Sequence, residues 1–465
     1  MPLKSVHITN YYHKHSGGIS TSFNNLMAAA KRCKRFVRLI VPGETETVED
    51  VNEYAKIYYV PAKYSPLFDK RYRIMMPWQY MLKGTVIRRI LLEEKPDMIE
   101  VIDKYTLSLI GPMIRTNNFK RIGRPMLVHF SCERMDDNVG SFVSNGRIGK
   151  WFARRIIGNY MMPSFDYHIA NSTYTAEEFY ESLSPEKNLR RSETFLNRTW
   201  RFFKAPRIPV GERIFVCPRG VDSVHFTPER TSDDIRREML AASGIPEDAV
   251  ILLYAGRLSP EKNIGLLVDL MKILAADGDQ DYRLLVAGDG PQSDWLKKQG
   301  ENFAAGKIIQ LGHMEKETLA NYYANADVFV HPNPKEPFGI APLEAMASGV
   351  ATVAPNAGGI LSYATNENAW LVEPTGENFA NAIREVVEND SLRKEKVTKA
   401  LETARANTRE ASTDRLFATY DRIYEDFQNR RELFTDIEKA KDFDFVKELL
   451  IGGVFGRSEI EDGVS

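Results

Sequence analysis

Short apolar runs alternate along the chain with longer segments in which apolar residues recur every three or four positions. In the first half the apolar runs cover 5–9, 37–41, 57–60, 98–101, 126–129 and 167–170. Amphipathic stretches such as 21–31, 80–94 and 175–181 lie between them. Short strands separated by helices are typical of a parallel sheet with helical crossovers. We therefore expect an α/β fold in this half.

The same alternation begins again after Gly220. Its predicted strands are 250–255, 282–287, 308–311, 328–330, 351–354 and 369–372, and helices are expected to begin near Pro260, Pro291, Glu315, Ala341 and Thr375. Because 465 residues exceed the usual size of one hydrophobic core, this recurrence predicts two Rossmann-like, doubly wound domains.

The predicted domain limits are 1–220 for the N-terminal domain and 221–410 for the C-terminal domain. A charged helix over 411–432 is expected to return to the first domain, and 433–465 to form a partly disordered tail. In parallel sheets, ligands bind at the carboxyl ends of the strands. We therefore expect the two domains to face a central cleft that holds the ligands.

Composition is that of an ordinary soluble protein, with 43% hydrophobic and 27% charged residues. No apolar stretch approaches the roughly 20 residues of a membrane-spanning helix, and the N-terminus has no pattern of a cleaved leader. The three cysteines, Cys33, Cys132 and Cys217, lack metal-ligand spacing. These features predict a reduced, cytoplasmic location.

Charge is distributed unevenly along the chain. Residues 1–220 contain 35 Lys and Arg against 21 Asp and Glu, whereas 221–465 contain 27 against 42. Such asymmetry suggests an anionic partner for the first half, and no nucleic-acid recognition motif is present. The basic, aromatic segments 70–78 and 147–162 could lie on an anionic membrane. A core-facing helix with a solvated basic face is an equal alternative for 147–162.

Two glutamates seven residues apart form the most informative pattern. Glu336 lies in a loop rich in Pro and Gly, and Glu344 lies in a helix that opens near Ala341. The start of a helix suits a diphosphate, because its backbone N–H groups and partial positive charge face the anion. Carboxylates accept hydrogen bonds from the hydroxyl groups of a sugar or a ribose. On the residues alone, two solvated glutamates beside an ordinary loop–helix junction remain the alternative.

The segment 331–349 resembles the E-x7-E motif of retaining glycosyltransferases of the GT-B fold, family 4 (glycosyl transferases group 1). Segments 254–263, 286–291, 311–313 and 326–330 resemble further motifs of that family, in the same order. The resemblance implies metal-independent transfer of a hexose from a UDP- or GDP-linked sugar to a saccharide or lipid-linked acceptor. It implies a role in polysaccharide or glycolipid biosynthesis, with the nucleotide sugar as co-substrate and no cofactor.

The resemblance also assigns roles to residues. Arg257 and Lys262 are expected to bind the diphosphate, Glu336 the transferred sugar and Glu344 the ribose. His129, at the end of the predicted strand 126–129, is expected beside the transferred sugar and completes the catalytic set. The remaining donor-site residues are Gly17, Gly18, Gly256, Gly288, His313, Met314, Phe338, Gly339, Ile340 and Ala341. On the acceptor side we expect Ser131, Glu133, Arg134 and Asn171.

Three departures from the family pattern affect these expectations. Arg219 replaces the usual Asn before Gly-Val-Asp, a charged segment 130–137 follows His129, and 360–363 lacks the usual Glu after Gly358-Gly359. The acceptor is therefore not implied by the resemblance.

Alternative functions on the same fold are a nucleotide-sugar epimerase, a sugar phosphorylase or a non-catalytic nucleotide-sugar-binding subunit. The chain shows no motif for a pyridoxal phosphate lysine, which argues against a glycogen-type phosphorylase. The intact Arg257, Lys262, Glu336 and Glu344 argue against a non-catalytic subunit.

Overall fold

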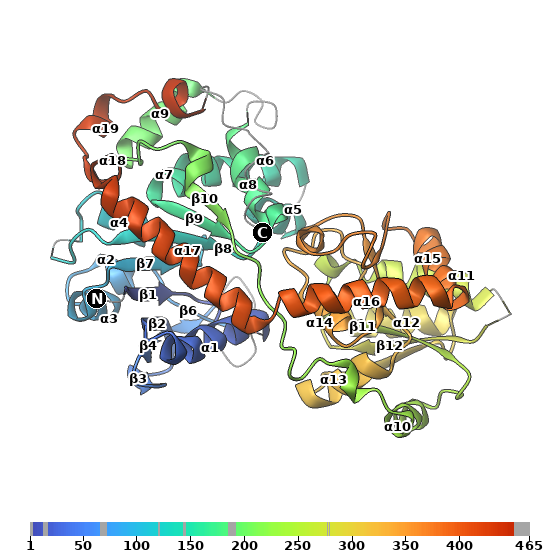
Figure 1. Cartoon of the computed structure of the whole chain (residues 1–465). Helices are drawn as coiled ribbons and strands as arrows, with labels where there is room; N and C mark the ends of the chain where they lie inside the picture. Colours follow the sequence, from blue (N-terminus) through green and yellow to red (C-terminus); the bar gives the residue numbers. More distant parts are fainter. Residues whose placement is uncertain are drawn as a thin grey trace. The chain divides into compact units, whose positions relative to one another are not determined.

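The computed structural model describes residues 3–12, 17–65, 72–119, 121–142, 146–184, 192–276, 278 and 280–450. The chain divides into two compact units. Unit 1 comprises 1–218 and 413–465, and unit 2 comprises 219–412. Each unit is a doubly wound α/β domain, which confirms the predicted fold class (Figure 1).

Unit 1 is built on an eight-stranded sheet with the order β10-β9-β8-β7-β1-β2-β4-β3. Its strands are β1 (Lys4–Ile8), β2 (Phe36–Gly43), β3 (Thr47–Asp50), β4 (Ala55–Pro61), β7 (Met98–Val101), β8 (Met126–Ser131), β9 (Tyr167–Ala170) and β10 (Ile214–Val216). All neighbours pair in parallel except β3 and β4. A separate two-stranded hairpin joins β5 (Lys63–Tyr64) and β6 (Arg73–Ile74). The strand order reverses between β1 and β7, where ligands bind in doubly wound sheets.

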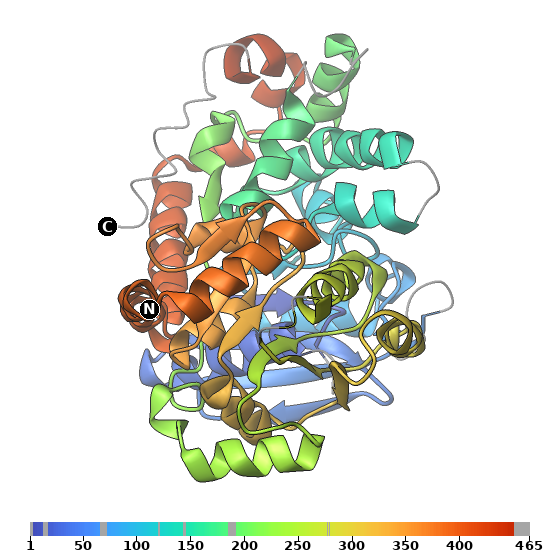
Figure 2. The same ribbon diagram turned by 90° about the vertical axis from the view of Figure 1, so that its right-hand side faces the viewer.

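Helices cover both faces of this sheet. One face packs on α3 (Val86–Glu94), α4 (Ile110–Arg115), α6 (Gly146–Ile156), η1 (Ile157–Met161), α8 (Thr173–Leu183) and α9 (Glu193–Phe202). The other packs on α1 (Gly17–Arg32) and α17 (Arg409–Asn429). Smaller helices are α2 (Trp78–Met81), α5 (Met135–Phe142), α7 (Met162–Ser164), η2 (Val210–Arg213), α18 (Arg431–Thr435), α19 (Lys439–Asp442) and η6 (Val446–Leu450). Helices α5 and α6 pack against each other (Figure 2).

Helix α17 is anchored to the unit 1 sheet by a buried polar chain. Tyr420 Oη donates to Glu100 Oε2 at 2.5 Å, and Glu100 Oε1 lies 2.8 Å from His7 Nδ1. Apolar side chains of α17 lie in the same buried cluster as strand residues. The segment 433–450 continues in unit 1, and the part of the predicted tail from 451 onward lies outside the described residues.

Unit 2 has a six-stranded, fully parallel sheet with the order β13-β12-β11-β14-β15-β16. The strands are β11 (Val250–Ala255), β12 (Tyr282–Ala287), β13 (Ile308–Gly312), β14 (Val328–Val330), β15 (Ala351–Pro355) and β16 (Trp370–Val372). One face packs on α10 (Asp233–Ser243), α13 (Lys316–Asn325), α14 (Ile340–Ala347) and α16 (Asp390–Ala406). The other packs on α11 (Gly265–Ala276), α12 (Ser293–Phe303) and α15 (Gly376–Glu388). Single turns η3 (Pro228–Arg230), η4 (Pro260–Lys262) and η5 (Gly359–Ser362) complete the unit.

In unit 2 the strand order reverses between β11 and β14. The loops after these two strands contain Lys262 and Glu336 respectively. Among the described residues, no helix has the length and apolar character needed to cross a membrane.

Candidate functional site

An ion pair joins the two loops at the reversal point of unit 2. Lys262, at the end of η4 after β11, donates from Nζ to Glu336 Oε2 at 2.7 Å. Asn333 Nδ2 donates to the same carboxylate oxygen at 3.0 Å. The loops are also linked by Asn263, whose Nδ2 donates to the Pro332 carbonyl at 2.9 Å. Lys262 and Glu336 are therefore held together by contacts between the two loops.

The electrostatics of this site keep Glu336 ionised. Burial alone would raise the pKa of Glu336, but the nearby Lys262 ammonium and His331, together with the Asn333 hydrogen bond, lower it to about 2. Burial lowers the pKa of His331 to about 4, so its imidazole is neutral at physiological pH. The site thus presents a carboxylate and an ammonium side by side.

Helix α14 begins directly after this loop. Gly339 caps it with a left-handed backbone, φ 85° and ψ 67°, which suits glycine. The Tyr363 hydroxyl donates to the Gly339 carbonyl and fixes the turn. The first N–H groups of a helix lack partners within the helix and favour anions. Backbone at Phe338, Gly339, Ile340 and Ala341 can therefore hold phosphate oxygens.

The pair Gly358-Gly359 packs tightly beneath the same loop. Gly359 N donates to the Glu336 carbonyl at 2.7 Å, and a Cβ at Gly359 would lie 2.0 Å from the Pro337 carbonyl oxygen. Only glycine fits there, so these two residues shape the backbone around Glu336. The following segment forms η5, whose Ile360 is buried. The missing Glu of the family pattern falls in this turn.

Glu344 is the fifth residue of α14 and so lies in the helix, as predicted. Tyr323 Oη of α13 donates to Glu344 Oε2 at 3.3 Å. Burial raises the pKa of Glu344 to about 7, although the Tyr323 hydroxyl and the charges of Arg409 and Lys316 act in the opposite direction. Glu336 and Glu344 therefore differ in protonation near neutral pH.

Glycines allow the turns after β11 and β12 to touch. A Cβ at Gly288 would lie 1.9 Å from the Gly256 carbonyl oxygen, and one at Gly290 2.2 Å from the Leu258 carbonyl oxygen. Gly256 and Gly288 have φ values of 156° and 145°. Backbone hydrogen bonds join these turns, including Leu258 N to the Asp289 carbonyl at 3.1 Å. Close packing accounts for Gly256 and Gly288 without a ligand contact.

The other predicted donor residues occupy three places. Arg257 is exposed after β11. His313 is exposed and Met314 half-buried just after β13. Gly17 and Gly18 form the first turn of α1 in unit 1, and 13–16 before them lie outside the described residues.

The prediction that His129 ends its strand is wrong. Strand β8 continues to Ser131, because Phe130 and Ser131 still pair with Ile169 and Ala170 of β9. His129 is fully buried against Phe165, His168 and Phe179, and burial keeps its pKa well below the usual value. It belongs to the interior of the sheet, and the strand end that was assigned to it is occupied by Ser131.

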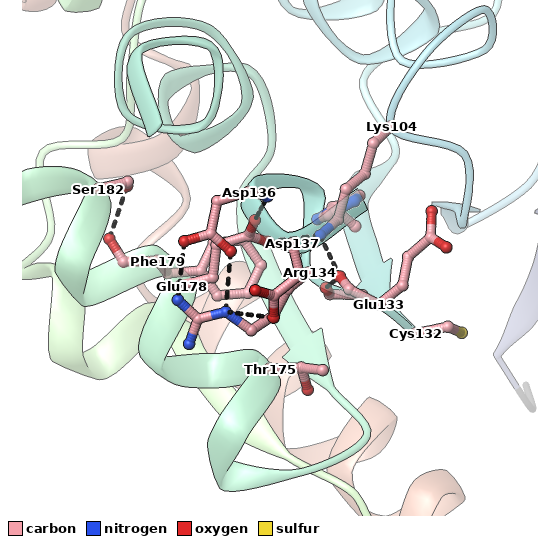
Figure 3. A network of polar contacts seen from close by, with 12 residues as sticks. Lys104, Cys132, Glu133, Arg134, Asp136, Asp137, Thr175, Glu178, Phe179 and Ser182 are labelled. Carbon is pink, nitrogen blue, oxygen red and sulfur yellow. Dashed lines mark hydrogen bonds and ion pairs between the residues drawn. The ribbon is translucent and has the colours of Figure 1, made fainter. Parts of the chain in front are cut away.

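Of the four residues expected on the acceptor side, three are buried within the fold and one is partly exposed. Ser131, Arg134 and Asn171 are buried, whereas Glu133 is partly exposed. Arg134 binds Asp136 at 3.0 Å and Glu181 at 2.6 Å, so its guanidinium is part of an internal ion network. Figure 3 shows this network, with the Glu133 and Cys132 side chains pointing away from it.

Helix α6 combines features of both alternatives for 147–162. Its Ala153 packs in the core, while Ile148, Trp151 and Phe152 are 65%, 45% and 55% exposed. Two of its basic residues pair with acidic side chains, with Lys150 Nζ 3.4 Å from Asp137 and Arg154 3.0 Å from Glu181. Arg155 instead lies over the Trp151 ring, 4.8 Å from its centroid, so the exposed apolar side chains have one guanidinium against them. In the other basic segment, Lys70 and Arg71 lie outside the described residues.

Sequence reasoning missed several supporting residues. Tyr323, Asn263 and Asn333 position the two glutamates and their loops, and the buried Lys104–Glu178 pair lies under the acceptor side. Asn263 and Asn333 lie inside the quoted motifs, which was the available signal. Lys104 and Glu178 are 74 residues apart, and no pattern in the sequence linked them.

Residues 235–403 match the family model "Glycosyl transferases group 1". A GDP-mannose-dependent alpha-(1-6)-phosphatidylinositol dimannoside mannosyltransferase of Mycobacterium tuberculosis is 27% identical over 390 residues, which cover 83% of this chain and 88% of the relative.

Two solved structures share the fold. Sucrose-phosphate synthase from Thermosynechococcus elongatus has a TM-score of 0.66 at 18% identity, covering 91% of this chain and all of the other. Anabaena HepE in complex with UDP and glucose has a TM-score of 0.62 at 17% identity, covering 90% and 99%.

Proposed function

Because this chain is a glycosyltransferase with the GT-B fold that uses a nucleotide sugar, we propose that unit 2 binds the donor and that transfer retains the anomeric configuration without a metal ion. The observation that carries the proposal is the Lys262–Glu336 ion pair at the reversal point of the unit 2 sheet. It offers a cation for the leaving diphosphate and a carboxylate for sugar hydroxyls, directly ahead of the α14 N-terminus.

The chemistry assigns one task to each group. The bond between the sugar anomeric carbon and the β-phosphate oxygen breaks, and the acceptor oxygen bonds to that carbon on the same face. The departing phosphate oxygen takes the acceptor proton. Lys262 and Arg257 stabilise the negative charge of the leaving diphosphate, a contribution worth about 10²–10³ in rate for one well-placed donor. Glu336 holds the sugar, and Glu344 holds the ribose.

For the donor and acceptor we propose GDP-mannose and a lipid-linked saccharide. The mycobacterial relative, which aligns with 83% of this chain, is named for GDP-mannose and a phosphatidylinositol dimannoside. A UDP-linked hexose is the second candidate, since HepE was solved with UDP and glucose. Neither an epimerase nor a non-catalytic subunit is favoured by these comparisons.

We also propose that unit 1 contacts the cytoplasmic surface of a membrane through α6. Ile148, Trp151 and Phe152 form an exposed apolar stripe at the spacing of one helical face. Aromatic residues of this kind partition into the interface between lipid headgroups and acyl chains. A lipid-linked acceptor would then be met at the membrane surface.

The test is transfer from labelled GDP-mannose and UDP-hexoses to a membrane lipid extract, with and without EDTA. We expect one donor to yield a labelled glycolipid with the donor's anomeric configuration, unaffected by EDTA. Release of free nucleotide only in the presence of added metal would contradict metal-independence. An inverted product would contradict retention.

A further inference from the structure

Three neighbouring strands of unit 1 end in loops that are held by buried polar groups. Strands β8, β7 and β1 lie side by side, and the strand order reverses between β7 and β1. After β1, Asn10 Nδ2 donates to Asp103 Oδ2 at 3.0 Å. After β7, Asp103 Oδ1 accepts from the Tyr105 backbone N–H at 2.7 Å. Asn10 and Asp103 thereby fix the positions of Tyr11 and Tyr105.

The loop after β8 is held from three directions. Asn171 Nδ2 donates to the Cys132 carbonyl at 3.2 Å, Ser131 Oγ donates to the Glu133 carbonyl at 3.1 Å, and Lys104 Nζ donates to the same carbonyl. Lys104 is itself fixed by a fully buried ion pair with Glu178 at 2.6 Å. A buried charge pair that also restrains a loop favours one geometry over alternatives.

These hydrogen bonds hold the backbone of the loop, and the Glu133 side chain leaves the ion network (Figure 3). In Figure 3 its carboxylate points away from Lys104 and the ion network, on the same side as Cys132. Tyr105 follows Lys104, which binds the Glu133 carbonyl, and Tyr11 follows Asn10, which binds Asp103. Burial and then the charge of the Glu133 carboxylate raise the pKa of both tyrosine hydroxyls. All three side chains are only partly buried. Asn138 forms a hydrogen bond with Glu133.

We propose that Glu133 binds a hydroxyl group of the acceptor, flanked by Tyr11 and Tyr105. This inference rests on the proposed function and concerns which part of the acceptor enters unit 1. A carboxylate accepts hydroxyl hydrogen bonds and repels phosphate, and tyrosine rings offer an apolar surface for a ring. The ligand class is therefore a saccharide or cyclitol ring, with any phosphate of the acceptor bound elsewhere.

The decisive variant is Glu133→Gln, which keeps size and removes the charge. We expect kcat/KM for the acceptor to fall about 10- to 100-fold, the usual range for a hydrogen bond to a charged group. Nucleotide affinity and slow hydrolysis of the donor by water should stay at wild-type values. Glu93→Gln is the matched control, since Glu93 is an exposed glutamate of α3 in the same unit.

A weaker variant separates positioning from binding. Ser131→Ala removes one donor to the Glu133 carbonyl, and we expect a rise of about 2- to 10-fold in the acceptor KM. Wild-type acceptor kinetics for Glu133→Gln would overturn the proposal, as would a parallel loss of nucleotide affinity, which would make Glu133 structural. If the wild-type protein neither binds nor hydrolyses any nucleotide sugar, the proposed function itself fails.

Discussion

Lys262 Nζ lies 2.7 Å from Glu336 Oε2, and this contact joins the loops after β11 and β14 where the unit 2 sheet reverses its strand order. In the proposed function, the pair supplies a cation for the diphosphate and a carboxylate for sugar hydroxyls. Burial raises the pKa of Glu336, and the charge of Lys262 helps to offset this. Charged groups that are fixed by contacts within the protein need less reorganisation in the transition state.

Glu336→Gln should reduce turnover by about 10- to 100-fold, because a charged hydrogen bond to the sugar becomes a neutral one. The fold should be preserved, since Glu336 lies in a loop and Lys262 remains partly exposed. Initial-rate kinetics and thermal unfolding measure the two effects. Glu388→Gln, an exposed change on α15, serves as the control. Turnover near the wild-type value would refute the assignment.

Lys262→Met should move the acid limb of the pH–rate profile to higher pH. Burial raises the pKa of Glu336, but the neighbouring charges and hydrogen bonds, with Lys262 first, lower it to about 2. Without the Lys262 ammonium, the Glu336 carboxylate is therefore protonated at a higher pH. In the wild type, Glu336 adds stability above its unfolded pKa of about 4.3, and this is lost as pH falls through 2. Lys335→Met is the neighbouring control, and an unmoved acid limb would contradict the coupling.

Nucleotide affinity should rise between pH 6 and pH 8 because Glu344, with a pKa of about 7, becomes a carboxylate that accepts ribose hydroxyls. Calorimetric titration with the bound nucleotide measures this rise. The Glu344→Gln variant should bind more weakly, with no change over the same range. A pH-dependence that persists in this variant would assign it to another group.

Glu344 should also reduce stability at alkaline pH. Its folded pKa is raised above the unfolded value of about 4.3, so the folded protein binds more protons and stability falls as pH rises from 4.3 through 7. Glu344→Gln is therefore expected to be more stable than the wild type at pH 8, by at least about 1 kcal/mol. Denaturant unfolding of both proteins at pH 4.5 and pH 8 tests this. An equal difference in the free energy of unfolding between variant and wild type at the two pH values would argue against titration of Glu344.

The double variant Trp151→Ser, Phe152→Ser should lose binding to anionic lipid vesicles while retaining activity on a soluble acceptor. Both side chains are about half exposed, so their removal costs interfacial contact and little core packing. Vesicle co-sedimentation is the measurement. Phe303→Ser, an exposed change on α12 of unit 2, is the matched control. Unchanged sedimentation would remove α6 as the contact surface.

Local patterns predicted most of the framework. The alternation of apolar runs located the central strands of both sheets, and the predicted start of a helix near Ala341 agrees with α14 beginning at Ile340. The edge strand β3 was missed because its residues, Thr47–Asp50, are all exposed and show no buried face. The predicted helix 80–94 is two helices, α2 and α3, separated by Gly84 with φ 80°.

The sequence predicted those parts of the candidate site whose residues are close together in the chain. It did not predict contacts between residues that are far apart in the chain. Glu336 and Glu344 lie on one loop–helix junction, so the Pro- and Gly-rich loop and the helical periodicity after it predicted their arrangement. His129 was misplaced because a run of apolar residues does not reveal that pairing with β9 extends β8 to Ser131. Lys104 and Glu178 meet only through the tertiary fold, so the support under Glu133 had no signal in the sequence.

The most direct test of the central claim is a thermal-shift panel of GDP, UDP, ADP and their hexose conjugates, with and without EDTA, on the wild type and Lys262→Met. We predict that one nucleotide family, GDP first, raises the Tm of the wild type regardless of EDTA and raises that of Lys262→Met much less. Equal stabilisation of both proteins, or none by any nucleotide, would contradict a donor site built on Lys262 and Glu336.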